Sequence, residues 1–153
     1  MPEISRSATV RVPPEVVWDF VKDFDNWAPF MMGYQSHQYV KDRESIWKLK
    51  AKLAGVTRVT KIHVNITEWD ESQHRIAFTI KGVSEPINGS GSVTMQICKQ
   101  EELGTLVTVE MALNYKGLIG AVMNPLITPL LKEVAQELAT KIVAAVEDTY
   151  RKH

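Results

Sequence analysis

Cysteine is nearly absent from this chain, because Cys98 is the only one among 153 residues. An internal disulfide is therefore excluded, and a zinc site would need histidine or carboxylate ligands. A single thiol fits a reducing compartment. The first residues, Met1 to Arg6, also lack the basic patch and the apolar run of a secretory signal, so we expect a cytoplasmic protein.

The chain has no excess of charge of either sign, with 18 Lys plus Arg against 18 Asp plus Glu. No net positive field exists to attract phosphates, so we expect no nucleic-acid partner. Apolar residues make up 44% and charged residues 24%, which is typical of a globular domain and unlike a disordered chain. The length fits one domain, which we place at residues 1–153, and nothing in the sequence specifies an oligomeric state.

Catalytic motifs are missing as well. The sequence contains no paired-histidine metalloprotease helix, no Gly-x-Ser-x-Gly elbow and no phosphate-binding loop ending in Gly-Lys-Ser/Thr. Gly89-Ser90-Gly91 lacks the third glycine of a dinucleotide motif, and close backbone approach in a strand explains it better. The histidines are scattered, at His37, His63, His74 and His153. We predict no catalytic residue, no metal and no cofactor, and we expect His37 to be an exposed residue of a sheet.

The amino-terminal residues predict a strand followed by two short helices. Residues 3–12 alternate between apolar and polar, and Pro13-Pro14 ends this pattern and can open a helix. Val17, Phe20, Val21 and Phe24 follow at helical spacing. Asp25-Asn26 can cap a second short helix, whose length is limited by Pro29.

Between Gly33 and Tyr115 the apolar residues recur with a period of two, which predicts six strands. The breaks are short and fall at 41–42, 55, 70–72, 84–86 and 101–104. Because such connections cannot hold crossover helices, neighbouring strands must be antiparallel. Trp47, Leu49 and Ala51 share one face while Lys48, Lys50 and Lys52 share the other. With the first strand, the sequence predicts an α+β fold with a seven-stranded antiparallel sheet that is dry on one face.

A long amphipathic helix is predicted at the carboxyl end, where it can cover the dry face. Leu131, Val134, Leu138, Ile142 and Val146 recur at steps of three and four residues. We place the start of this helix at Thr128-Pro129, as a cap and first position, and count roughly 33 Å to Tyr150. Residues 117–128 are then expected to form a separate flap.

Residues 117–131 form a mostly apolar run that two prolines interrupt. Spanning the hydrocarbon of a bilayer needs about 20 residues, so we do not expect this run to cross a membrane. We expect it to pack on the sheet and line the mouth of a pocket, and peripheral insertion into a membrane is the alternative.

The order of elements resembles the helix-grip fold of the START-like (SRPBCC) superfamily, over nearly the whole chain. Val12-Pro13-Pro14-Glu15-Val16-Val17-Trp18, with Asp23 after it, is similar to the opening helix of that superfamily. Leu53-Ala54-Gly55-Val56 and the stretch from Ile80-Lys81-Gly82 to Val93, together with Met32-Gly33, resemble the CoxG-like branch, which is named for a subunit of carbon monoxide dehydrogenase, or the polyketide cyclase-like branch. The resemblance implies a curved sheet wrapped around the long helix and a cavity between them.

Methionines, which are flexible and polarizable, also fit a cavity lining, although a fully packed core would use them equally well. The predicted ligand-binding residues from the sheet are Trp47, Leu49, Phe78, Met95, Val109 and Met111. Those from the helix are Met123, Ile127, Leu131 and Val134. Trp27, Phe30 and Met31 are expected at the rim, with Tyr115 or Arg58 as a polar contact.

Three functions are compatible with these features. The first is a non-catalytic carrier or sensor of a hydrophobic or aromatic molecule that is lipid-, quinone- or polyketide-like. The second is a cyclase, aromatase or hydrolase that uses a polar group inside the cavity, which the absence of an inward-facing histidine or aspartate pair disfavours. The third is an accessory protein that docks on a membrane or an oxidoreductase through residues 117–131.

Overall fold

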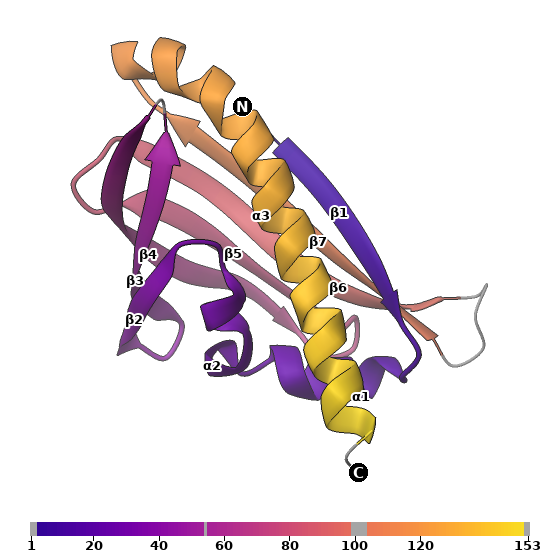
Figure 1. Cartoon of the computed structure of the whole chain (residues 1–153). Helices are drawn as coiled ribbons and strands as arrows, with labels where there is room; N and C mark the ends of the chain where they lie inside the picture. Colours follow the sequence, from indigo (N-terminus) through magenta and orange to yellow (C-terminus); the bar gives the residue numbers. More distant parts are fainter. Residues whose placement is uncertain (1–2, 54, 99–103, 152–153) are drawn as a thin grey trace.

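The computed structural model describes residues 3–53, 55–98 and 104–151. Its strands are β1 (Glu3–Val10), β2 (Tyr34–Lys41), β3 (Glu44–Leu53), β4 (Val56–Asp70), β5 (Arg75–Gly82), β6 (Ile87–Cys98) and β7 (Gly104–Tyr115). Its helices are α1 (Pro14–Val21), α2 (Phe24–Trp27), the 3-10 helix η1 (Ala28–Phe30) and α3 (Leu118–Arg151). The predicted strand, pair of short helices, meander and long helix are confirmed, and Figure 1 shows their arrangement. The predicted cap Asp25-Asn26 was wrong, because α2 begins earlier and its cap is Asp23, whose Oδ1 accepts a hydrogen bond of 3.0 Å from the Asp25 backbone N–H.

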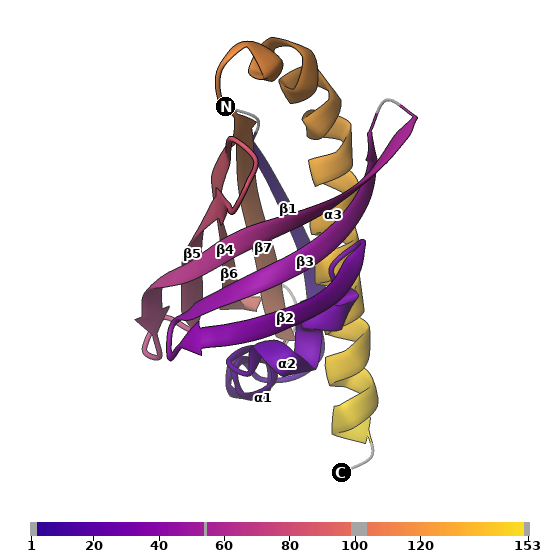
Figure 2. The same ribbon diagram turned by 90° about the vertical axis from the view of Figure 1, so that its left-hand side faces the viewer.

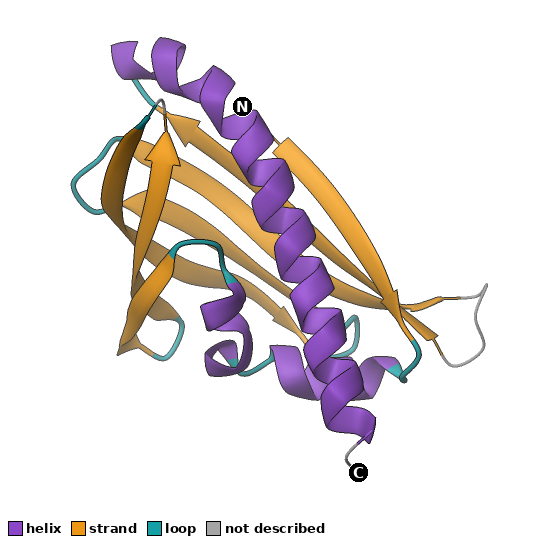
Figure 3. Ribbon diagram, in the orientation of Figure 1, coloured by secondary structure: helices purple, strands orange, loops and turns teal. Residues whose placement is uncertain are grey.

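Within these described residues the strands form one sheet of seven, in the order β1-β7-β6-β5-β4-β3-β2. All neighbours are antiparallel, and β1 pairs with β7, so the first strand lies beside the last. The sheet is strongly curved, and α3 runs across its inner face while α1 and α2 lie at one end (Figures 2 and 3). This is the predicted helix-grip arrangement.

The period-two pattern places the expected side chains on the inner face. Trp47, Ile76, Val93, Val107 and Val109 are all buried. The close approach expected at the glycines of β6 is also present, because Gly91 lies opposite Phe78 and a Cβ on Gly91 would lie 2.6 Å from the Phe78 ring. Glycine therefore leaves the space that this aromatic ring occupies.

The helix α3 covers the inner face and contacts β1 and β7. Leu138, Ile142 and Val146 point into the core and are at most 1% exposed. Burial of each such side chain stabilises the fold by about 1.5–3 kcal/mol. The predicted apolar stripe therefore has the predicted function of closing the core.

The expected break at Thr128-Pro129 was wrong, because α3 is one continuous helix from Leu118 that contains both Pro125 and Pro129. Its first turns lean away from the axis of the rest (Figure 2), as prolines inside a helix allow. Asn124 fixes these turns to the end of β7. Its Oδ1 accepts a hydrogen bond from the Tyr115 backbone N–H (2.8 Å), and its Nδ2 donates to Asn114 Oδ1 (2.9 Å). Residues 117–128 are therefore held in place and do not form a separate flap.

Candidate ligand-binding site

A cavity of about 360 Å³ lies between α3 and the inner face of the sheet. Ile127, Leu130, Leu131 and Val134 of α3 form one wall, and strands β3 to β7 form the other. The volume falls at the lower end of the range of about 300–1,000 Å³ that is usual for small-molecule sites. The space between helix and sheet is therefore not completely packed, and it can admit a compact guest.

Several predicted site residues line this cavity, namely Met31, Leu49, Met111, Tyr115, Ile127, Leu131 and Val134. They come from α3, from β3 and β7, and from the residue that follows η1. Their contact with a ligand stays a prediction.

Other predicted site residues lie in the hydrophobic core and are outside the cavity lining. These are Trp27, Trp47, Phe78, Met95, Val109 and Met123, with Phe30 packed against the core from outside. Met123 is buried in the first turns of α3. For the residues nearer α1 and α2 the reason is an aromatic cluster centred on Phe24, whose ring centroid lies 4.8 Å from Trp27, 6.2 Å from Trp47 and 6.4 Å from Phe78. This cluster fills the α1–α2 end of the fold, so the cavity is confined to the opposite part of the inner face.

The lining also contains residues that we did not predict: Met32, Lys50, Ala51, Lys52, Thr60, Ile62, Ile80, Ile87, Ala112, Leu113, Leu130 and Glu133. Ala51 belongs to the predicted dry face, so the pattern identified its side of the sheet. The pattern does not show how far along a strand the cavity extends. Lys50 and Lys52 were predicted on the wet face because they alternate with the apolar residues of that strand.

A polar group of side chains lies at one edge of the cavity. Arg58 Nη1 lies 2.9 Å from Glu85 Oε1, and the Thr60 hydroxyl donates a hydrogen bond of 3.0 Å to Glu85 Oε2. Burial raises the pKa of the Tyr115 phenol, the Glu85 charge raises it further, and Arg58 opposes them. Because Tyr115 is 5% exposed and lines the cavity, it presents a neutral phenol there near pH 7. Arg58 itself is outside the lining, since it is directed to Glu85.

The expectation for His37 was wrong, because only 9% of its side chain is exposed. The residue turns inward beside α2, where its ring stacks on Trp47 at a centroid distance of 5.3 Å. Its Nε2 lies 2.7 Å from Asp25 Oδ1, and its Nδ1 lies 2.6 Å from the Tyr34 hydroxyl. None of these three polar side chains lines the cavity, so the group connects α2 to β2 and does not face a ligand there.

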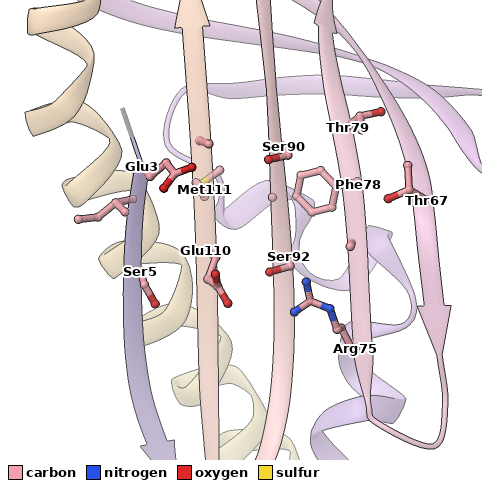
Figure 4. A pocket seen from close by; sticks show the side chains of 14 residues that line it. Glu3, Ser5, Thr67, Arg75, Phe78, Thr79, Ser90, Ser92, Glu110 and Met111 are labelled. Atoms are coloured by element: carbon pink, nitrogen blue, oxygen red, sulfur yellow. The ribbon is translucent and has the colours of Figure 1, made fainter. Parts of the chain in front are cut away.

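A second hollow of about 470 Å³ lies over the outer face of the sheet, and its lining includes the short side chains of Ser5, Ser90, Ser92 and Thr79 (Figure 4). Its one cationic side chain among the described lining, Arg75, already contacts Glu68 Oε1 and Thr94 Oγ1, each at 2.9 Å. The hollow is open, with short polar side chains in its walls. We therefore regard it as a solvated part of the outer face.

The described residues contain no group of three or more histidine, cysteine, aspartate or glutamate side chains placed to hold a metal ion. Cys98 ends β6, and its side chain lies outside the described part.

Comparison with known protein families gives a match over nearly the whole chain. A model of the family described as polyketide cyclase / dehydrase and lipid transport matches residues 1–147. No curated protein sequence matches the chain.

Solved structures share the fold at low sequence identity. A conserved protein from Geobacillus kaustophilus is 16% identical with a TM-score of 0.78, over 96% of both chains. A START superfamily protein from Mycobacterium smegmatis is 14% identical with a TM-score of 0.69, over 96% of this chain and 98% of that chain. An aromatase/cyclase from Streptomyces is 13% identical with a TM-score of 0.68, over 95% of this chain and 93% of that chain. At these identities the likeness establishes the fold.

Proposed function

The chain belongs to the polyketide cyclase / dehydrase and lipid transport family, and from this membership we propose that its cavity binds a hydrophobic or aromatic small molecule, as a carrier or sensor. The predicted START-like resemblance is confirmed, while the resemblance to the CoxG-like branch stays a prediction. The observation that carries the proposal is the cavity of about 360 Å³ between α3 and the sheet.

The dimensions and lining of the cavity favour a compact guest. Its walls are mainly aliphatic and methionine side chains, whose contact with apolar surface is favourable because water is released. The aromatic cluster around Phe24 closes the space at one end. A ring system or a single short chain therefore fits better than a lipid with two long chains.

Protein purified under native conditions, without detergent, is expected to retain an extractable apolar compound. Organic extraction followed by mass spectrometry checks this, with a protein of other fold from the same cells as the control for adventitious lipid. The proposal fails if the extracts of the two proteins match and if N-phenylnaphthylamine, a neutral apolar fluorophore, also gives no saturable binding.

The polar edge of the cavity indicates a ligand that carries a neutral polar group. The charges of Arg58 and Glu85 compensate each other at 2.9 Å, so a charged ligand group would gain little from either. Arg58 hydrogen-bonds to the Tyr115 phenol oxygen, and the phenol O–H remains as a donor. We expect a hydroxyl or carbonyl of the ligand to lie against it.

Tyr115→Phe is expected to weaken the binding of naphthol by roughly fivefold, since one net hydrogen bond contributes about 1 kcal/mol. Binding of naphthalene, which has no polar group, should not change and is the matched control; fluorescence titration measures both. Equal losses for the two compounds would contradict a hydrogen bond to Tyr115. If the protein is instead a cyclase or aromatase, the same substitution should abolish turnover while naphthalene binding and the melting temperature stay the same.

A further inference from the structure

The first turns of α3 carry two apolar stripes, and the sheet covers only one of them. The covered stripe consists of Ile119, Met123, Ile127 and Leu131, which recur at four-residue steps and face the protein. The uncovered stripe begins one residue earlier and consists of Leu118, Val122 and Leu126, which are 95%, 67% and 36% exposed. The next residue of this stripe, Leu130, lines the cavity. An apolar path therefore leads along one helix from solvent to the interior.

A helix at the surface of a protein normally presents polar side chains to water. The described chain contains one helix, Leu118–Tyr150, that is long and apolar enough by length and composition to cross a membrane. In the structure its carboxyl-terminal half covers the sheet, and only 28% of its apolar stretch of 18 residues is buried. The apolar composition of the first turns is thus not explained by packing in the core.

Two further segments extend this apolar surface. The β3–β4 hairpin and the loop between β5 and β6 lie at the same end of the molecule as the start of α3, in both Figure 1 and Figure 2. Val56 on the hairpin is 56% exposed, and Val83 on the loop is 54% exposed. The loop is bonded to the approach to α3, because the Lys116 backbone N–H donates to the Pro86 carbonyl at 2.7 Å.

The charge at this end has one dominant sign, although the whole chain is neutral. Residues 50–60, which lie nearest the turn of the hairpin, contain Lys50, Lys52 and Arg58 and no acidic residue, and residues 111–132 contain Lys116 and Lys132 and no acidic one. Lys50 and Lys52 lie in the wall of the cavity. The acidic residues at this end are Glu3 at the start of β1, Glu85, which is paired with Arg58, and Glu133. An exposed apolar stripe with a basic surround is complementary to an anionic lipid surface.

We propose that this end of the protein docks on an anionic lipid bilayer. Leu118 and Val122 enter the boundary between head groups and acyl chains, and the lysines of the hairpin contact the lipid phosphates. Docking in this orientation turns the cavity wall at Leu130 toward the membrane. Transfer of a guest along that path rests on the proposed binding function, whereas docking itself does not.

The experiment is flotation of the purified chain with two kinds of vesicle, phosphatidylcholine alone and phosphatidylcholine mixed with phosphatidylglycerol. We expect flotation with the mixed vesicles, and less of it at high salt. The double variant Leu118→Glu/Val122→Glu should reduce this binding by at least about tenfold, because charged groups enter lipid unfavourably. Val40→Glu changes a valine that is 53% exposed on β2, away from this end, and should leave flotation unchanged.

A second variant tests the electrostatic part. Lys52→Glu/Lys116→Glu should weaken binding to the mixed vesicles and leave any binding to pure phosphatidylcholine as it was. The proposal would be overturned if the protein floated with neither kind of vesicle, or if the Leu118→Glu/Val122→Glu variant floated as well as the wild type. It would also be overturned if the wild type self-associated in size-exclusion chromatography and the Leu118→Glu/Val122→Glu variant did not. In that case a second copy of the chain would cover the apolar stripe.

Binding of N-phenylnaphthylamine to the Leu118→Glu/Val122→Glu variant separates the two proposals. Fluorophore binding that persists while flotation is lost shows that the cavity is intact and that the docking surface alone was removed. Flotation of wild type that binds no fluorophore supports docking and contradicts the proposed ligand-binding function.

Discussion

Val134→Trp is expected to lower the affinity for N-phenylnaphthylamine by roughly 5- to 150-fold, because inserting bulk where a guest sits costs about 1–3 kcal/mol. Val134 is partly buried on α3 and lines the cavity, so a larger side chain there occupies the ligand's space and need not displace backbone. The melting temperature should change little, since the void can receive the indole. Fluorescence titration and thermal denaturation measure the two effects.

Val143→Trp is the matched control. Val143 is also partly buried on α3 and packs against the core, but it lies outside the cavity lining. We expect it to reduce stability while leaving the affinity of the fluorophore near that of the wild type. Equal loss of affinity in both variants would mean that the fluorophore binds elsewhere, and would contradict the assignment of this cavity as the ligand site.

Ile142→Ala is expected to lower the free energy of unfolding by about 2–5 kcal/mol, because Ile142 is 0% exposed and its removal leaves a void against the sheet. For a chain of this size each kcal/mol lowers the melting temperature by roughly 2–4 °C. Ile142→Val should cost only about 0.5–1.5 kcal/mol. Urea denaturation of the graded pair measures both values.

Thr149→Ala, at an exposed position of the same helix, is the control and should change stability by less than about 0.5 kcal/mol. A similar small effect at Ile142 would contradict the packing of α3 on the sheet. The same packing lets this helix close the cavity.

The sequence was sufficient for the strands, the antiparallel order of the six that follow Gly33, and the existence of the covering helix, but not for the pairing of β1 with β7 or for the start of that helix. Breaks such as Lys41-Asp42 and Asp70-Glu71-Ser72 separate runs whose period of two is a local property of the backbone, and short connections leave antiparallel neighbours as the only arrangement. Leu138, Ile142 and Val146 marked the buried side of α3 in the same way. The period of the apolar residues therefore predicts which side of a strand or helix each residue occupies.

Only the tertiary structure decided how far along each element the cavity extends. Met95 and Val109 share the phase of Met111, yet only Met111 lines the cavity, because the aromatic side chains on α2 fill one end of the interior. The same helix brings Asp25 to His37 and turns that histidine inward. The helix α3 continues past two prolines, and hydrogen bonds of Asn124 fix its first turns to the end of β7. In each case the deciding contact joins residues on different elements, and local spacing carries no information about such contacts.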